Sequence, residues 1–281
     1  MSTATSATSS APADQGGRRR SVQVRPVTTL TATRAEWVKF RSLRSSWLVT
    51  GLTTVGVIGI AALIAHFTNT HFATMHPQER AHFNPVTTVL NGVNFAQLTL
   101  GILGVLFVTG EYGTGMIRAT LAAVPRRLPV LAGKVAVVGA IALVASIVAT
   151  VVSFLVGEQL LGSHSVGWGY PGATRAVLGA ALYLTVVSLL GVALGFIVRS
   201  TAGGIGALFG LLLILPVIFE ALPSSWNATV GPYLPSNAGG ALWQLSPDHA
   251  LLSPWAGFGI FCAWTAAALV VAGLLLRRRD A

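Results

Sequence analysis

Long apolar stretches separated by short polar segments divide this chain. They are Trp47–His66, Leu90–Thr109, Val130–Val156, Ala176–Val198, Ala202–Leu222 and Trp255–Leu276. Each is close to the roughly 20 residues that a helix needs to cross the hydrocarbon of a bilayer. Lipid offers no partner for unpaired backbone groups, so every stretch is expected to be helical. The pattern predicts an all-α integral membrane protein with six transmembrane helices.

The placement of charge predicts how these helices are oriented. Charged residues make up only 9% of the 281 residues, and the mean hydropathy is +0.71. Sixteen of the eighteen Lys and Arg residues lie on one side of the predicted membrane, and only Arg80 and Arg175 lie on the other. Basic loops stay in the cytoplasm, so we expect a multi-pass protein of the plasma (inner) membrane with both termini cytoplasmic. The same placement explains the net charge of +10 without any binding to nucleic acid.

The chain divides into a tail and a membrane domain. Residues 1–33 are rich in Ser, Thr and Ala and contain the basic run Arg18–Arg20. This composition predicts a disordered, basic cytoplasmic tail. Residues 34–281 form the predicted six-helix membrane domain. Its loop over Pro223–Pro254 is rich in Pro, Gly and Trp, which predicts short interfacial or re-entrant helices.

The membrane domain shows little of the chemistry that ion-driven carriers or ATPases need. The ionisable residues near the spans sit at their ends, where Lys134 is expected to reach the headgroups and Glu220 to be an interfacial carboxylate. Gly133-Lys134 resembles the end of a phosphate-binding loop, but Leu128 replaces its first glycine and Val135 its Ser/Thr. We expect no cofactor on this chain, so ATP would have to act on a separate polypeptide.

Enzyme-like groups are sparse and belong to the loops. His66, His71, His76 and His82 lie in or beside the first outer loop, with spacings that match no standard zinc pattern. Ser246, Asp248 and His249 are close only in sequence, which is weak evidence for a catalytic triad. We therefore predict no catalytic or metal residues. A membrane scaffold, or an enzyme acting in the outer loops, stays the competing hypothesis.

Polar and small residues inside the spans have two interpretations. Asn91, Asn94 and Gln97 are spaced by three and would share a helix face, which predicts either a substrate-path lining or hydrogen bonds between helices. Gly191-xxx-Gly195 and Gly206-xxx-Gly210 permit close helix approach, within the bundle or between two copies.

Two basic segments on the predicted cytoplasmic side are expected to form short helices outside the spans. The first, Arg34–Trp47, mixes basic and aromatic residues, which suits a helix at the headgroups. The second follows the second span, and in it Ile117, Leu121 and Val124 form one apolar stripe that Pro125 would end. Such a stripe could fill a groove on a soluble partner.

Together these segments resemble the permease subunit of type-2 ATP-binding-cassette (ABC-2) transporters. The most specific part is Glu111-Tyr112-Gly113-Thr114-Gly115-Met116-Ile117-Arg118, followed by Leu121–Arg127 and Lys134. The resemblance implies a permease domain over 34–281 with an amphipathic entry helix near Arg34–Ser45, a coupling helix near Thr114–Val124 and a re-entrant region within Pro223–Pro254.

The resemblance also implies partners and site residues. It predicts an exporter driven by a cytosolic ATP-binding-cassette ATPase that carries ATP and Mg, and a second permease copy in a homodimer. The implied entry-helix residues are Arg34, Trp37, Lys39, Arg41 and Arg44. The implied ATPase-coupling residues are Glu111, Thr114, Ile117, Arg118, Leu121 and Val124, of which Glu111 would pair with a base of the entry helix or cap the coupling helix.

Overall fold

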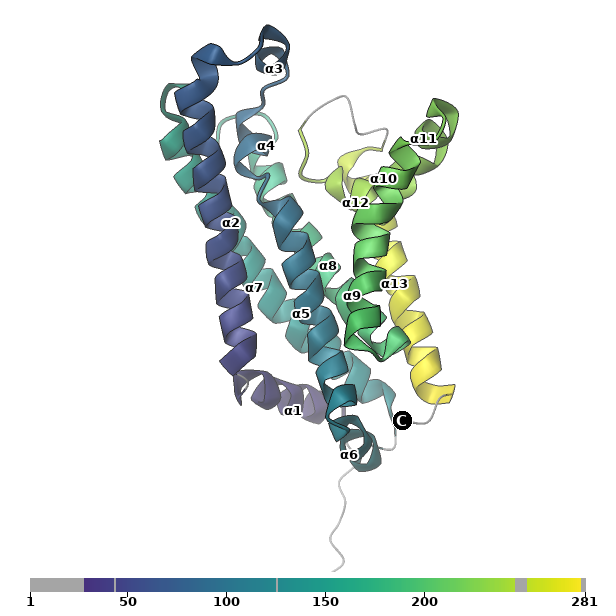
Figure 1. Ribbon diagram of the computed structural model, residues 1–281. Helices are drawn as coiled ribbons and strands as arrows, with labels where there is room; N and C mark the ends of the chain where they lie inside the picture. Colours follow the sequence, from purple (N-terminus) through teal and green to yellow (C-terminus); the bar gives the residue numbers. More distant parts are fainter. Residues whose placement is uncertain (1–27, 43, 125, 246–251, 279–281) are drawn as a thin grey trace, which may run out of the picture.

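The fold is a bundle of long helices. The computed structural model describes residues 28–42, 44–124, 126–245 and 252–278, and within these ranges it contains helices and turns but no strand. Figure 1 shows the long helices standing side by side, with short helices at both ends of the bundle. The predicted all-α fold is therefore confirmed.

Six segments of the described chain are long and apolar enough to cross a membrane, as predicted. The first three are Arg44–Thr74 (α2, Arg44–His71, and η1, Phe72–Thr74), Pro85–Gly113 (α4, Pro85–Val89, and α5, Val93–Gly113) and Leu128–His164 (α7, Leu128–Leu161, and η2, Gly162–His164). The others are Ala173–Val198 (α8), Thr201–Glu220 (α9, Thr201–Phe209, η3, Gly210–Ile214, and α10, Leu215–Glu220) and Pro254–Arg278 (α13).

Several of these helices continue beyond the predicted span. Helix α7 has 34 residues, which corresponds to about 51 Å at 1.5 Å per residue. A bilayer's hydrocarbon core is only about 30 Å thick, so α7 extends out of it. Hydropathy detects the apolar middle of such a helix and misses its polar ends.

The centre of the bundle is the contact between α5 and α8, which depends on glycine. A Cβ added at Gly104 would overlap the carbonyl oxygen of Ser188, and one at Gly191 would overlap that of Gly101. Gly195 likewise faces Val108 of α5. The pair Gly191-xxx-Gly195 therefore packs within the bundle, which is one of the two alternatives that the sequence left open.

The fifth span is less regular than the other five and the least buried of the six. Its middle, η3, is a π-helical turn that directly precedes α10, whose second residue is Pro216. Such turns accommodate a proline, which has no backbone N–H to donate. Gly206 and Gly210 have no other atom within 4 Å of an added Cβ, so this pair faces away from the rest of the chain.

The predicted re-entrant region consists of short helices: α11 (Ser224–Val230), η4 (Gly231–Tyr233) and α12 (Pro235–Gly240). A Cβ at Gly239 would lie 2.6 Å from the Tyr183 ring and 2.8 Å from the Phe261 ring, so α12 is wedged between α8 and α13. Arg175 donates from Nη1 to the carbonyl oxygen of Leu242, at 2.6 Å, just after α12. Arg175, one of the two basic residues predicted on this side of the membrane, thus holds the chain that follows α12 against α8.

The bundle has two different ends. Helices α1 (Thr29–Ser42) and α6 (Met116–Ala123) lie at the same end as the last turn of α13 (Figure 1). Helix α1 lies across this end of the bundle, at an angle to the long helices. We call this the α6 end. Helices α3 (Pro77–Ala81) and α11 lie at the opposite one, which we call the α3 end. The entry helix begins at Thr29, five residues before its predicted start, and residues 1–27 lie outside the described ranges.

We predict that Gly104→Ala lowers the free energy of unfolding by about 1–3 kcal/mol, because the methyl group would push α5 away from the α8 backbone. Gly110→Ala is the matched control on the same helix, since no atom lies within 4 Å of its added Cβ. That control should be neutral or stabilising, because alanine favours a helix. Thermal unfolding in detergent measures both; equal melting temperatures for the two variants would contradict the packing described here.

Candidate functional site

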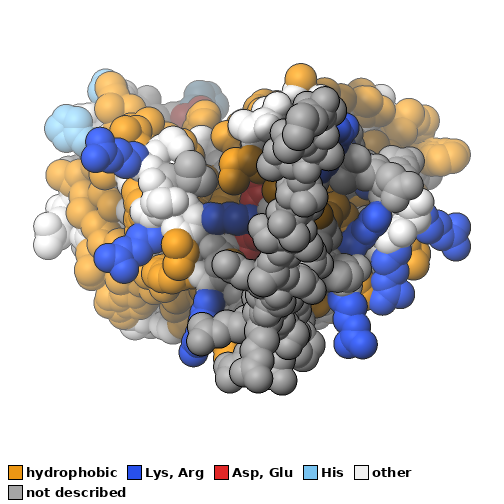
Figure 2. Space-filling model, turned by 90° about the horizontal axis from the view of Figure 1, so that it is seen from below, with side chains coloured by type: hydrophobic (Ala, Val, Ile, Leu, Met, Phe, Trp, Pro, Cys, Tyr) orange, Lys and Arg blue, Asp and Glu red, His pale blue; other side chains and the backbone are white. Residues whose placement is uncertain are grey.

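A buried ion cluster joins separate segments of the chain at the α6 end. The Nζ of Lys134, in the second turn of α7, lies 2.8 Å from Oε2 of Glu36 in α1 and 2.6 Å from Oε1 of Glu111 near the end of α5. The Nζ of Lys39 lies 3.0 Å from Oε1 of Glu36 and 3.1 Å from Oε1 of Glu111. Figure 2 looks onto this end and shows acidic side chains beside a basic one in its middle. Two lysines thus balance two glutamates.

Lys134 is the centre of the cluster. Its side chain has no exposed surface, and its third contact is the carbonyl oxygen of Phe107, at 3.4 Å. The ammonium also lies 4.6 Å from the centre of the Phe107 ring, within the range of a cation–π contact. The expectation that Lys134 reaches the headgroups is therefore wrong: paired carboxylates keep its charge inside the protein.

The neighbouring glycine explains how α1 comes so close. A Cβ at Gly133 would lie 3.2 Å from the carbonyl carbon of Ala32, so α1 rests directly on α7 at this position. Ala32, Glu36 and Phe40 recur every four residues and form the buried face of α1. In Gly133-Lys134 the glycine thus admits the entry helix and the lysine pairs with it, which is a packing role and not a phosphate-binding one.

Lys39 closes the cluster toward solvent. Its side chain is 28% exposed, and its Nζ also lies 3.4 Å from Oγ1 of Thr120 in α6. Burial lowers the pKa of Lys39, but the carboxylates of Glu36 and Glu111 outweigh that effect and raise its pKa above the ordinary 10.5. The ammonium therefore stays charged at neutral pH. Two roles were predicted for Glu111, and the structure shows the first: Glu111 pairs with a basic residue of the entry helix, Lys39.

A glycine cap precedes helix α6, and the apolar side of the helix packs against the rest of the chain. Gly115 caps it with φ of 71°, a left-handed conformation that glycine adopts without strain, while Thr114 caps the end of α5. Ile117 and Leu121 are 2% and 9% exposed and belong to the same cluster as Phe40 and Phe107. The stripe predicted to fill a partner's groove is therefore covered by its own chain, and Val124 packs at its edge.

The free face of α6 is a different one. Met116 is 54% exposed, and Arg118 and Ala119 are exposed beside it. The prediction was wrong about the face because apolar residues at helical spacing pack against the apolar surface that the fold provides. Here that surface is the cluster that contains Phe40 of α1 and Phe107 of α5. Coupling to an ATPase stays a prediction for α6 as a whole.

The outer face of α1 suits a membrane surface. Arg34 and Arg41 are exposed, and Trp37 and Val38 between them are 44% and 64% exposed. Arg44, the last of the predicted entry-helix residues, begins α2. Glu36 was missing from the predicted site, although an acid between Ala32 and Phe40 at four-residue spacing was a usable signal.

Further contacts connect the remaining spans to the α6 end. Arg127, just before α7, donates from Nη1 to the carbonyl oxygen of Leu276 near the end of α13, at 3.0 Å. Arg199 ends α8 in the left-handed conformation, and its guanidinium lies 5.4 Å from the centre of the Tyr112 ring. Thr201 donates to Thr109 of α5 at 2.9 Å. The basic loops therefore contact neighbouring helices.

The predicted substrate-path residues are divided between two environments. Asn94 donates to Asn91 at 2.7 Å, and both are exposed, with Asn91 just before α5. Gln97 is buried and accepts a hydrogen bond from the hydroxyl of Tyr183 in α8. Gln97 thus joins two helices, whereas the asparagine pair at the α3 end stays a candidate lining.

The other candidate groups form no site in the described part of the chain. Among those residues, no three His, Cys, Asp or Glu side chains lie close enough to hold a metal ion. His71 and His82 instead contact backbone carbonyl oxygens of their own segments. Ser246, Asp248 and His249 lie outside the described ranges.

We predict that Lys134→Met lowers the free energy of unfolding by about 3–5 kcal/mol, because it leaves the half-buried Lys39 alone to balance the carboxylates of Glu36 and Glu111. The exposed Arg118→Met is the control, and it should change stability by less than about 0.5 kcal/mol. Denaturant unfolding in detergent measures both. A loss below about 1 kcal/mol for Lys134→Met would contradict the buried cluster, because only exposed ion pairs contribute so little.

Comparison with known proteins agrees with the family resemblance. A family model described as "ABC-2 family transporter protein" matches residues 32–223, which is more than half of the chain. The matched region begins in α1 and includes the whole ion cluster and α6. No curated protein matches the chain.

Proposed function

We propose, from the premise that this chain belongs to the ABC-2 transporter family, that it is the permease subunit of an exporter driven by ATP hydrolysis on a separate ATPase. Membership of the family makes the chain a transmembrane permease of the ATP-binding-cassette type and a transport subunit rather than an enzyme. The direction of transport and the ATPase partner, with its ATP and Mg, are our proposal.

The observation that carries this proposal is the connection between α6 and the spans. Helix α6 presents Met116, Arg118 and Ala119 outward. Its Ile117 is buried in the apolar cluster that also contains Phe40 of α1 and Phe107 of α5. Directly behind it, the ion cluster ties α1 and α5 to α7. A soluble partner that pushes on the exposed face of α6 would therefore move these helices together.

The energetics favour such a rigid movement. Separating Lys134 from its carboxylates would leave buried charges unpaired, at a cost of about 3–5 kcal/mol. Transport then requires two packings of the spans whose balance is shifted by nucleotide on the partner.

A second copy of the chain is the other proposed partner. The fifth span is apolar, yet only 22% of its most hydrophobic window is buried. Val217 and Ile218 are 58% and 50% exposed, and the open glycines Gly206 and Gly210 lie on the same span. These features support a homodimer formed along α9 and α10. The charge distribution supports a plasma-membrane location with the α6 end, and both termini, in the cytoplasm.

Purification of the tagged chain from its native membranes tests the proposal. We expect an ATP-binding-cassette ATPase to co-purify, and the mass of the complex to correspond to two permease and two ATPase copies. Ala119→Glu should weaken this association about tenfold or more, equivalent to about 1.4 kcal/mol, because a charged side chain would stand on the exposed face of α6.

The matched control is Ala81→Glu, an exposed alanine in α3 at the opposite end of the bundle. It should leave the ATPase yield unchanged. Recovery of the chain without an ATPase, or equal retention of the ATPase by both variants, would overturn the proposal.

A further inference from the structure

A continuous groove runs along the outside of the bundle between α2 and α5. Helix α2 packs mainly against α7 and α5 mainly against α8, and α2 and α5 contact each other less extensively. One cavity of about 250 Å³ lies between the middle parts of α2 and α5, and a second of about 450 Å³ lies at the α6 end. Both are lined by Val49 and Leu106, so they adjoin end to end.

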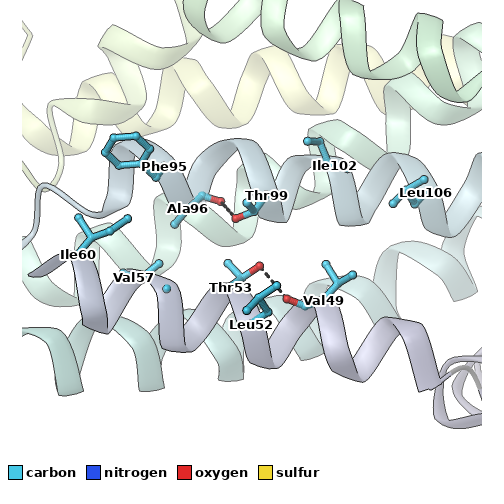
Figure 3. Close-up of a pocket in the computed structure, with 11 residues that line it drawn as sticks. Val49, Leu52, Thr53, Val57, Ile60, Phe95, Ala96, Thr99, Ile102 and Leu106 are labelled. Atoms are coloured by element: carbon cyan, nitrogen blue, oxygen red, sulfur yellow. Dashed lines mark hydrogen bonds between the residues drawn. The ribbon is translucent and has the colours of Figure 1, made fainter.

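The two parts of the groove differ in chemistry. The middle part is apolar, and Figure 3 shows its lining side chains on two neighbouring helices, α2 and α5. Its threonines add little polarity, because Thr53 donates to the carbonyl oxygen of Val49 at 2.8 Å and Thr99 to that of Ala96 at 3.1 Å. Those hydroxyls are satisfied within their own helices, so the groove mainly offers carbon atoms.

The part at the α6 end carries polar groups where α1 meets α2. Lys39, Ser42, Ser45 and Ser46 line it from α1 and α2, and Phe107, Glu111 and Thr114 line it from α5 and its C-terminal cap. The charges of Lys39 and Lys134 are balanced by the two glutamates of the ion cluster, but the exposed Arg41 and Arg44 flank these serines in the chain. The lining charges of Lys39 and Glu111 thus cancel, and the exposed Arg41 and Arg44 add positive charge beside the mouth of the groove.

From this amphiphilic shape we infer that the groove is a binding site for one anionic phospholipid, with an acyl chain between α2 and α5 and its phosphate at Ser42 and Ser45. The inference goes beyond the proposed function, because it requires neither the ATPase nor transport.

The length of the apolar part agrees with an acyl chain. Val49 and Ile60 stand eleven residues apart on α2, and Phe95 and Leu106 the same distance apart on α5. Eleven residues span about 16 Å of helix. Half of a hydrocarbon core of about 30 Å is about 15 Å. The groove thus covers one leaflet, from the headgroup level to the bilayer midplane.

The position and exposure of the groove agree with access from lipid. Leu52 and Phe95 at its rim are 67% and 59% exposed. Both belong to helices that are long and apolar enough to cross a membrane. Basic residues beside a membrane span attract anionic lipids, which selects a phosphatidylglycerol-like headgroup over a zwitterionic one.

Native mass spectrometry of the full chain in detergent, titrated with phosphatidylglycerol or phosphatidylcholine, tests the site. We expect one tightly retained phosphatidylglycerol and about tenfold weaker binding of phosphatidylcholine, equivalent to about 1.4 kcal/mol. Gly56→Leu should weaken the binding of phosphatidylglycerol by at least a similar factor, because Gly56 lines the groove and nothing lies within 4 Å of its added Cβ. Gly59→Leu, equally open but outside the groove, is the control.

The headgroup end has its own pair of variants. Ser45→Asp should repel the phosphate and weaken the binding of phosphatidylglycerol, whereas the neutral Ser45→Asn should retain it. An acid in the first turn of α2 favours the helix, so Ser45→Asp should fold. Thr99→Leu fills the groove from α5 and replaces Gly56→Leu if that variant does not fold.

Three results would overturn the inference. The first is equal affinity of the wild type, Gly56→Leu and Thr99→Leu for phosphatidylglycerol. The second is equal binding of both lipids by the wild type. The third is a change from dimer to monomer in Gly56→Leu alone, because a second copy of the chain would then be the occupant of the groove. All three are measured on the chain without its ATPase, so none of them bears on the ATPase partner or on transport. The third would also move the proposed dimer contact from α9 and α10 to the groove.

Discussion

The ammonium of Lys134 and its two carboxylates are the interaction on which the α6 end depends. A lysine without exposed surface is costly to bury, by several kcal/mol per ion. The cost is offset only because Glu36 and Glu111 lie within 2.8 Å of its Nζ. These three residues come from segments far apart in the chain. The pairing therefore fixes the entry helix, the second span and the third span relative to one another.

The surrounding structure follows from this constraint. Gly133 has no side chain, which lets α1 approach α7 closely enough for Glu36 to reach Lys134. Ile117 of α6 is buried in the apolar cluster that also contains Phe40 of α1 and Phe107 of α5. Helix α6 is thus attached to the part of the bundle that the buried ion pairs hold together. This is the property that a helix needs if it is to transmit movement from a soluble partner into the membrane.

The sequence predicted the bundle well, because lipid imposes one simple rule on every span. All six spans and the short helices of the Pro223–Pro254 loop were visible as apolar length and turn composition. The site was predicted only in part. Glu111 and the entry helix were found, but Lys134 was placed at the headgroups and Ile117 on a free surface. Both errors concern which neighbour covers a side chain, and hydropathy and periodicity contain no information about contacts between distant segments.

A double-mutant cycle between Glu36 and Lys134 tests the central claim most directly. It compares Glu36→Gln, Lys134→Met and the double variant by their free energies of unfolding in detergent. We predict a coupling energy of about 1.5–3 kcal/mol, at the upper end of values for residues in one buried network. Effects that add to within about 0.5 kcal/mol would contradict the claim, because they would mean that α1 and α7 are held together by something other than this ion pair.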